Sequence, residues 1–191
     1  MRAVLASGSL ACALLCSCAS TQDATPAQAA ELETFAHGNL FFSGQPKRAD
    51  LQRLVTSGEI ARVLSCRSEA EMANRERVPF DQEAYAESIG LEYAFIGTGG
   101  SDGYSPEKVD AFAEWIESSD EPALVHCASG GRAKYLYLAY LVRHRGYSPD
   151  EALALGRDQL GLNYSVMERL TGYEFTQSVA RPLPEPEPDR E

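Results

Sequence analysis

The stretch 123–145 constrains the fold of this chain more than any other segment. It begins with Ala-Leu-Val-His, four residues typical of a short buried strand, and continues through Cys-Ala-Ser-Gly-Gly. From Arg132 to Arg145 the sequence predicts a helix that is apolar on nearly all sides, and such a helix is stable only when it is buried. A buried strand that leads directly into a buried helix predicts that both lie at the centre of one domain.

Segments typical of strands and of helices alternate along the chain. Strands are expected at 39–43, 60–65, 91–96 and 123–126, and helices at 51–58, 81–89, 105–116, 132–145 and from 148 onward. Two of these helices open with Ser-Pro, an N-cap followed by a proline in the first turn. The alternation predicts an α/β domain with a mainly parallel central sheet flanked by helices.

Composition narrows the class of protein. The 191 residues suffice for one domain with tails. The 17 Lys and Arg residues against 28 Asp and Glu residues give a net charge of −11, which argues against a general binder of nucleic acid or of anionic membranes. Five cysteines are too few for a disulfide scaffold, and there is no Cys-x-x-Cys pair. We therefore expect neither a metal nor a cofactor.

The N-terminus has the pattern of an export signal. A basic start precedes an apolar run at 3–15 that is too short to cross a bilayer. The following Leu-Cys-Ser-Cys at 15–18 resembles a bacterial lipobox, which implies cleavage before Cys18 and a lipid on its thiol. Since Ala19 and Ser20 carry no inner-membrane retention signal, we expect an outer-membrane anchor that faces the periplasm. The alternative is a secretory signal with incidental cysteines.

These features divide the chain into four parts. Residues 1–17 are expected to form the lipoprotein signal peptide, and the small residues of 18–30 a flexible tether. The folded domain is expected at 31–180. The alternating prolines and acids of 181–191 predict a disordered tail. The protein would then contact a membrane only through its lipid.

The loop after the 123–126 strand carries the chemistry. Two glycines allow successive backbone N–H groups to point inward and form an anion nest, and the helix N-terminus adds its positive end. Both favour the thiolate of Cys127, the reactive form of cysteine. Arg132 can hold an oxyanion with two parallel hydrogen bonds. The loop residues expected to bind the anion are Ala128, Ser129, Gly130 and Gly131. The site suits phosphoryl or sulfur transfer to or from a small oxyanion or phosphorylated substrate.

A cysteine and an arginine placed between strand and helix resemble the active-site loop of the protein tyrosine phosphatase superfamily, in its dual-specificity-like branch. Four blocks follow one bacterial group of that superfamily in order: Ser-Gly-Gln-Pro at 43–46, Arg-Val-Leu-Ser-Cys-Arg-Ser-Glu at 62–69, Gly-Leu-Glu-Tyr at 90–93 and Val-His-Cys-Ala-Ser-Gly at 125–130. This group is the beta-lactamase-hydrolase-like family of phosphatase-like domains, and the resemblance covers about residues 37–162. It implies a protein tyrosine phosphatase-like fold and a phosphatase with Cys127 as nucleophile.

The loop departs from that family in one respect. Tyrosine phosphatases place five residues between the cysteine and the arginine, whereas this chain has four, and Ala133 stands where many relatives carry a hydroxyl residue. The shorter loop resembles that of rhodanese-type sulfurtransferases, in which Cys127 would carry a persulfide. A catalytically weak anion-binding module is the third alternative. Because positions 128–131 carry no lysine and the chain is acidic, polyphosphoinositide-type substrates are not expected.

A phosphatase also needs a general acid for the leaving oxygen. The resemblance places this role on Asp102, although Ser-Asp-Gly is also a common turn sequence. It implies an orienting role for His126, at the end of the strand before the nucleophile. The acidic residues Glu69, Glu71, Glu83 and Glu87 are interpreted as solvated helix surface.

Cys66 follows the 60–65 strand as Cys127 follows the 123–126 strand. If these strands are parallel neighbours, the two cysteines leave the sheet at the same edge, within the separation that a disulfide spans. A cysteine there also resembles the redox partner of some phosphatases in the superfamily. Cys66 is therefore either a reversible partner of Cys127 in the oxidising periplasm or a small core residue.

Overall fold

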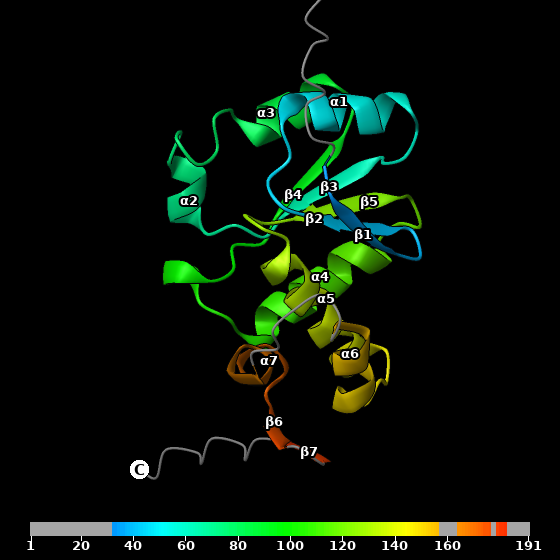
Figure 1. Cartoon of the computed structure of the whole chain (residues 1–191), viewed down its shortest axis with the longest axis vertical. Coiled ribbons are helices and arrows are strands. Elements are labelled where there is room, and N and C mark those ends of the chain that lie inside the picture. The colour runs from blue at the N-terminus through cyan, green and yellow to red at the C-terminus, as the bar shows by residue number, and fades with distance from the viewer. Residues whose placement is uncertain (1–31, 157–163, 177–178, 183–191) are drawn as a thin grey trace, which may run out of the picture. The chain divides into compact units, whose positions relative to one another are not determined.

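The protein is described by a computed structural model that covers residues 32–156, 164–176 and 179–182. Its central sheet has five strands in the order β1-β2-β5-β3-β4 (Figure 1). The strands are β1 (Thr34–His37), β2 (Leu40–Ser43), β3 (Arg62–Ser65), β4 (Glu92–Phe95) and β5 (Ala123–His126). Four of them run parallel, and β1 pairs antiparallel with β2 at one edge. The predicted α/β fold with a mainly parallel central sheet is confirmed.

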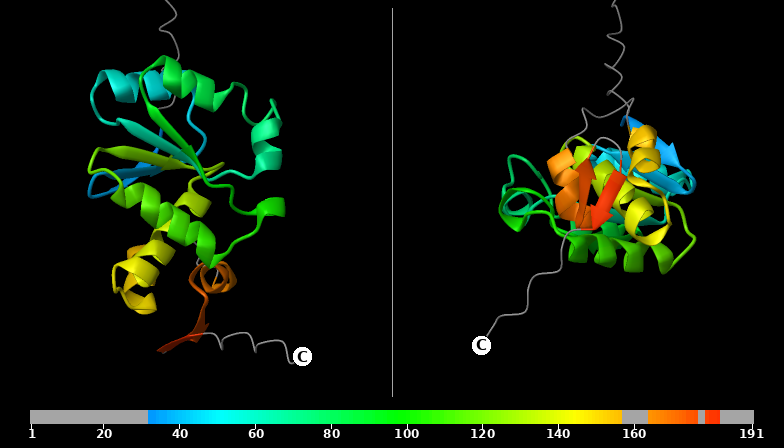
Figure 2. Two further views of the ribbon diagram at one scale, coloured as in Figure 1. Left: turned by 180° about the vertical axis from the view of Figure 1, so that it is seen from behind. Right: turned by 90° about the horizontal axis from the view of Figure 1, so that it is seen from below.

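Helices cover both faces of this sheet. Figures 1 and 2 show α1 and α3 on one face and α4 and α5 on the other. The helical segments are α1 (Arg48–Thr56), α2 (Glu69–Ala73), α3 (Gln82–Ser88), the 3-10 turn η1 (Gly100–Asp102), α4 (Pro106–Glu117), α5 (Gly131–His144), α6 (Pro149–Gly156) and α7 (Tyr164–Thr171). Among the described residues no helix is both long and apolar enough to cross a bilayer.

The sheet separates two apolar clusters. Because successive side chains of a strand point to opposite faces, Leu124 packs with α1 and α3, whereas Val125 packs with α4 and α5. Both residues are fully buried, as the sequence predicts for β5. Strand β5 lies between β2 and β3. Helix α5 follows β5 in the chain, and its side chains belong to the larger cluster. The segment that most constrained the fold is therefore its centre.

Several elements were not expected from the sequence. Strand β1 was missed because it is an edge strand with alternating exposed and half-buried residues. The five-residue helix α2 and the helix α7 were also missed. After α7, strands β6 (Tyr173–Thr176) and β7 (Val179–Pro182) form an antiparallel hairpin. This hairpin extends over 181 and 182, which the sequence analysis placed in the tail.

The expected signal peptide at 1–17, the lipidated Cys18 and the tether at 18–30 lie outside the described residues, as does the tail from 183 onward. Within residues 32–156, 164–176 and 179–182, no three His, Cys, Asp or Glu side chains are grouped as metal ligands would be.

Candidate active site

Cys127 stands at the end of β5 with 1% of its surface exposed. The backbone N–H of Gly130 donates a hydrogen bond to its Sγ at 3.2 Å, as the anion-nest interpretation of this loop requires. Gly130 is the N-cap of α5 and has a left-handed φ of 89°. A Cβ at this position would also stand 3.3 Å from the backbone of Ser43, so glycine is the residue that fits.

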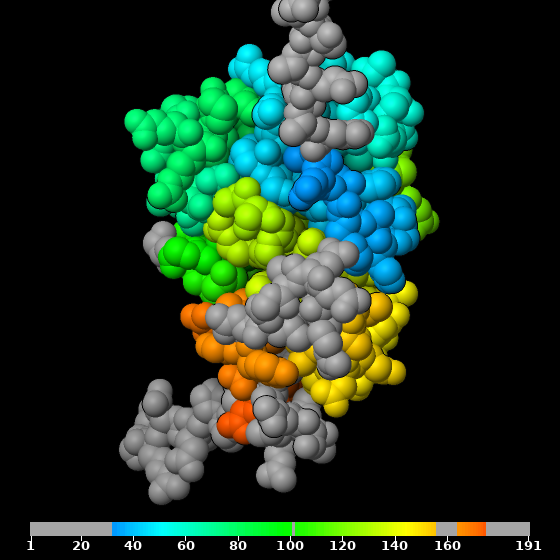
Figure 3. All heavy atoms as spheres, in the orientation of Figure 1, coloured from blue at the N-terminus to red at the C-terminus, as the bar shows by residue number. Residues whose placement is uncertain are grey.

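The loop is held in place by the segment that follows β2. Gly44 and Ser129 form an isolated β-bridge, and the N–H of Gln45 donates to the carbonyl of Ala128 at 3.1 Å. A Cβ on Gly44 would come within 3.0 Å of that same carbonyl oxygen. This close approach gives a physical reason for the glycine at position 44. Figure 3 shows the beginning of α5 at the surface, beside the segments around β2 and α2.

Arg132 lies in the first turn of α5, and hydrogen bonds hold one edge of its guanidinium. Nη1 donates to the carbonyl of Thr98 at 2.8 Å and pairs with Glu71 Oε2 at 2.7 Å, while Nη2 donates to Glu71 Oε1 at 3.0 Å. Burial by itself would lower the pKa of Arg132, but the hydrogen bonds to Glu71 and the neighbouring Cys127 outweigh it and raise that pKa. The guanidinium therefore lies between a carboxylate and the candidate nucleophile, fixed in one orientation.

The expectation that Glu71 is solvated surface is wrong. Its side chain is 14% exposed and lies among three guanidinium groups, with Arg67 at 3.3 Å and Arg77 at 3.8 Å in addition to Arg132. The hydrogen bond from Arg132, with help from the N–H of Ser68, lowers the pKa of Glu71 to about 2. Glu71 is thus an ionised residue that positions Arg132.

The sequence holds a signal for this placement. Ser68 and Glu71 form the capping box that starts α2, in which each side chain bonds the backbone N–H of the other residue. A capping box fixes where Glu71 stands on its own helix. It does not reveal that Arg132, 61 residues away, lies opposite. The other acidic residues in that expectation, Glu69, Glu83 and Glu87, are exposed as predicted.

Asp102 lies in η1 with its carboxylate turned toward α2. Its Oδ2 accepts the backbone N–H of Glu69 at 2.8 Å. A Cβ on Gly97 would stand 2.3 Å from that oxygen, so the carboxylate occupies space that only a glycine leaves open. This bond ties η1 to the start of α2. The general-acid and the turn interpretations of Asp102 both stay predictions.

His126 is fully buried beneath the loop. Its Nδ1 lies 3.3 Å from the carbonyl oxygen of Cys127, and its Nε2 has no hydrogen-bond partner among the described residues. Burial lowers the pKa of His126 to about 4, so the ring is neutral at pH 7. A neutral ring against the Cys127 backbone is consistent with an orienting role.

Cys66 and Cys127 leave neighbouring parallel strands. Ser65 and His126 are paired in the register of β3 and β5, and the N–H of Cys66 donates to the carbonyl of His126 at 2.7 Å. Both thiols are free and buried. Burial first, and then the proximity of Cys127, raise the pKa of the Cys66 thiol well above its ordinary value. The strands are adjacent as the redox hypothesis requires, and the disulfide itself stays a prediction.

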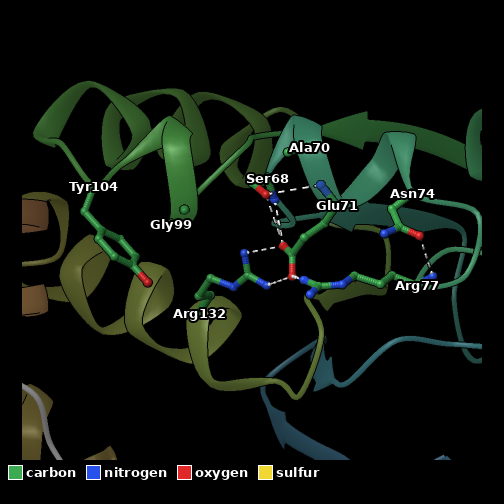
Figure 4. Close-up of a pocket in the computed structure, with 9 residues that line it drawn as sticks. Ser68, Ala70, Glu71, Asn74, Arg77, Gly99, Tyr104 and Arg132 are labelled. Atoms are coloured by element: carbon green, nitrogen blue, oxygen red, sulfur yellow. Dashed lines mark hydrogen bonds and ion pairs between the residues drawn. The ribbon is translucent and has the colours of Figure 1, made fainter.

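A cavity of about 510 Å³ adjoins this site, and Arg132 is one of the residues that line it. Figure 4 shows Arg132, Glu71 and Arg77 converging there, with Tyr104 at the opposite wall. The residues around the cavity are Ser68, Ala70, Glu71, Asn74, Arg77, Gly99, Gly100, Tyr104 and Arg132. The cavity is therefore contiguous with the candidate anion site through one shared side chain.

No protein-family model matches this chain, and no curated protein matches it either. Solved structures do. Tk-PTP in its active form is 24% identical, with a TM-score of 0.58 and coverage of 72% of this chain and 94% of that one. PTPMT1 in complex with PI(5)P is 21% identical, with a TM-score of 0.57 and coverage of 71% and 89%. The core catalytic domain of the PP-IP phosphatase SIW14 from S. cerevisiae is 15% identical, with a TM-score of 0.58 and coverage of 76% and 87%.

These similarities confirm one part of the sequence analysis. The chain has the protein tyrosine phosphatase-like fold, with a central sheet flanked by helices. At these identities the likeness concerns the fold alone. The narrower assignment to the beta-lactamase-hydrolase-like family stays a prediction.

Proposed function

We propose that this protein is a cysteine-dependent phosphatase that hydrolyses phosphoesters through the thiolate of Cys127. The hydrogen bond from the Gly130 N–H to Cys127 Sγ carries the proposal, because it places a backbone donor on the sulfur. Arg132 begins the helix that this loop opens, with one guanidinium edge fixed by Glu71. A nucleophile, backbone donors and an oriented guanidinium are the parts that phosphoryl transfer through a cysteine needs.

The first step of the proposed mechanism forms a covalent intermediate. The Cys127 thiolate attacks the phosphorus atom, so an S–P bond forms and the P–O bond to the leaving group breaks. Arg132 and the loop N–H groups hold the phosphoryl oxygens while their charge is redistributed. Asp102, protonated and released from Glu69, gives its proton to the leaving oxygen.

The second step regenerates the enzyme. A water molecule attacks the phosphorus, its proton passes to the Asp102 carboxylate, and the S–P bond breaks to release phosphate and the thiolate. The neutral ring of His126 keeps the Cys127 backbone in position throughout. These steps use only side chains, backbone N–H groups and water.

One sequence observation favours a second candidate function. Only four residues separate Cys127 from Arg132, which is the spacing of rhodanese-type sulfurtransferases. In that reaction the thiolate takes the outer sulfur of thiosulfate, releases sulfite and carries the sulfur as a persulfide. The third candidate, a weak anion-binding module, is supported by the bond that holds Asp102 on Glu69.

The proposed place of this activity is the bacterial envelope. The Leu-Cys-Ser-Cys of 15–18 supports lipidation at Cys18 and an outer-membrane anchor that faces the periplasm. Mass spectrometry of the mature N-terminus is expected to find acyl groups on Cys18. A soluble product cleaved at another position would contradict the anchor.

The oxidising periplasm gives Cys66 its proposed role, the reversible capping of Cys127. Mild peroxide is expected to convert both thiols of the folded protein into one disulfide, with activity restored by a thiol reductant. Two free thiols after that treatment would contradict the role. In Cys66→Ala protein, the same peroxide dose is expected to inactivate a larger share irreversibly.

Parallel assays of the purified protein on 4-nitrophenyl phosphate and on thiosulfate test the main proposal. Phosphate release that disappears in the Cys127→Ser variant is the expected result. A sulfur adduct of about 32 Da on Cys127 after thiosulfate, without phosphate release, would establish the sulfurtransferase instead. Neither product, with phosphate still bound, would establish the binding module.

A further inference from the structure

The cavity beside Arg132 is lined by basic side chains, although the protein as a whole is acidic. The chain as a whole carries 17 basic and 28 acidic residues. Arg77 and Arg132 line this cavity. Arg67 pairs with Glu71, and Arg169 lies over the ring of Tyr104, two other residues of the lining. Among the described residues that line the cavity, Glu71 is the only one with a carboxylate.

The carboxylate of Glu71 leaves part of this positive charge uncompensated. Its carboxylate can neutralise one of the three guanidinium groups that surround it. The contact with Arg77 is 3.8 Å, which is longer than a hydrogen bond. The side chain of Arg77 is 62% exposed and lines the cavity, so its donors can reach a ligand there.

Arg67 is a second indication that the positive charge near the cavity is not fully compensated. The residue is 3% exposed, yet its Nε has no hydrogen-bond partner among the described residues. Burial is the main cause that lowers its pKa, and the neighbouring Arg132 lowers it further. Two buried or half-buried guanidinium groups next to each other are costly unless anions compensate them. Glu71 supplies one such anion, and a substrate would supply the others.

Arg77 and Arg132 stand close enough to bind one small molecule together. Arg132 Nη2 and Arg77 Nη1 both approach the same atom, Glu71 Oε1, at 3.0 and 3.8 Å. If Arg132 holds a phosphoryl group at Cys127, the guanidinium of Arg77 lies beside that of Arg132 and can contact a second anionic group of the same molecule. The ring of Tyr104, with the guanidinium of Arg169 at 5.0 Å from its centre, forms the opposite wall.

We propose that this cavity is a second anion subsite, and that the substrate is a small phosphorylated molecule carrying another phosphate group next to the one removed. The proposal rests on the proposed phosphatase function and specifies its substrate class. Arg77 is the residue that recognises the second group. The lack of lysine at 128–131 and the acidic composition argued against polyphosphoinositide-type substrates, one class of such molecules. The fold changes that argument, since it brings arginines of other segments to the loop.

Binding of inorganic phosphate and inorganic pyrophosphate to the Cys127→Ser protein, measured by calorimetry, tests the proposal without turnover. Pyrophosphate is expected to bind about tenfold more tightly than phosphate, because a second charge-assisted contact forms. Adding Arg77→Gln is expected to weaken pyrophosphate binding about tenfold and phosphate binding less than about threefold.

Arg75→Gln is the matched control. It removes the same charge two residues away, but Arg75 donates to the carbonyl of Phe80 and lines a different cavity. The pyrophosphate preference is expected to survive in this variant. A pyrophosphate affinity no greater than that of phosphate, a preference that persists in Arg77→Gln, or equal losses in both variants would overturn the subsite.

The test of the anion subsite and the test of the proposed phosphatase function can fail independently of each other. Hydrolysis of 4-nitrophenyl phosphate by the wild-type protein tests the phosphatase alone, since this ester carries a single phosphate. If that hydrolysis fails while Arg77 still selects pyrophosphate, the anion subsite stands and the phosphatase is wrong. If hydrolysis occurs and the selection fails, the phosphatase stands and the subsite is wrong.

Discussion

Strand β3 has a buried arginine at each end, and the two arginines are bound differently. Arg62 begins the strand with 1% of its surface exposed and donates to the carbonyls of Trp115 and Ser119, to Ser118 and to Glu92. Its guanidinium also lies 4.2 Å from the centre of the Trp115 ring. Every described contact of Arg62 therefore joins elements of the fold.

Arg67, just past the other end of β3, is equally buried but incompletely bonded. Its Nε has no partner among the described residues, and neither does Nε2 of His126 at the end of β5. Buried polar atoms are almost always paired, so unpaired ones at one edge need an explanation. At the amino edge of the sheet the hydrogen bonds of the buried arginine all go to the fold itself. At the carboxyl edge, buried polar atoms and positive charge stay available for a ligand.

The largest effect is expected from the general acid at the carboxyl edge. Asp102→Asn keeps the acceptor that bonds the Glu69 N–H but removes the proton that a leaving oxygen needs. On a phosphoester with a poor leaving group, kcat is expected to fall roughly 10²–10⁴-fold. With 4-nitrophenyl phosphate, whose leaving group is good, the loss is expected to be much smaller. Equal losses on both substrates would show that Asp102 only shapes the loop.

Arg132→Lys tests whether geometry or charge matters at this edge. Lysine retains the positive charge but cannot give two parallel hydrogen bonds. The value of kcat/KM for phosphoesters is expected to fall roughly 10²–10³-fold, as for the loss of a transition-state donor. The thermal midpoint serves as the control. Full activity in this variant would mean that bidentate binding is not used.

Glu71→Gln is expected to loosen Arg132 without touching the substrate. We expect kcat to fall about tenfold with KM nearly unchanged, because the positioned transition-state donor is affected more than binding. A parallel loss of stability and no kinetic change would make Glu71 purely structural.

The same residue predicts a pH effect on stability. Glu71 has its pKa lowered to about 2 in the folded protein. Its ion pairs therefore stabilise the fold fully above the unfolded pKa of roughly 4.3, and this contribution is lost as the pH falls toward 2. The contribution is about 2–3 kcal/mol. Urea unfolding at pH 7 and at pH 3 is expected to show this pH dependence in the wild type, and less of it in Glu71→Gln.

The paired variants Arg62→Met and Arg67→Met test the comparison between the two ends of β3. Arg62→Met removes hydrogen bonds to the part-buried carbonyls of Trp115 and Ser119 and to Glu92, at a cost of about 2–4 kcal/mol, and the thermal midpoint is expected to fall by about 5–10 °C. Its kcat in the folded protein is expected to stay within about twofold. Arg67→Met is expected to lose more activity and less stability. The reverse result would contradict the distinction between the two edges.

The part of the candidate site that is contiguous in the chain could be predicted from the sequence. The strand, Cys127, the glycine loop and the helix of Arg132 follow one another directly, so their order and chemistry could be predicted together. Their partners could not. Glu71 lies 61 residues from Arg132 in sequence, and only the order β2-β5-β3 brings the loop between segments of the first half of the chain.

The role of Asp102 shows the same limit in another form. Its type and its place before α4 suggested an acid, and its neighbours suggested a turn. The choice depends on a hydrogen bond to Glu69, which begins a five-residue helix that no periodicity predicts. Short elements and side-chain pairs between distant segments are therefore the parts of the site that needed the structure.

In the proposed mechanism Cys127 becomes covalently phosphorylated during turnover. Rapid acid quenching of the reaction with 4-nitrophenyl phosphate, followed by peptide mass spectrometry, measures this directly. An adduct of about 80 Da, one phosphoryl group, is expected on the peptide with Cys127 and none on the peptide with Cys66. Phosphate release without any adduct on Cys127, in reactions quenched before the first turnover is complete, would contradict it.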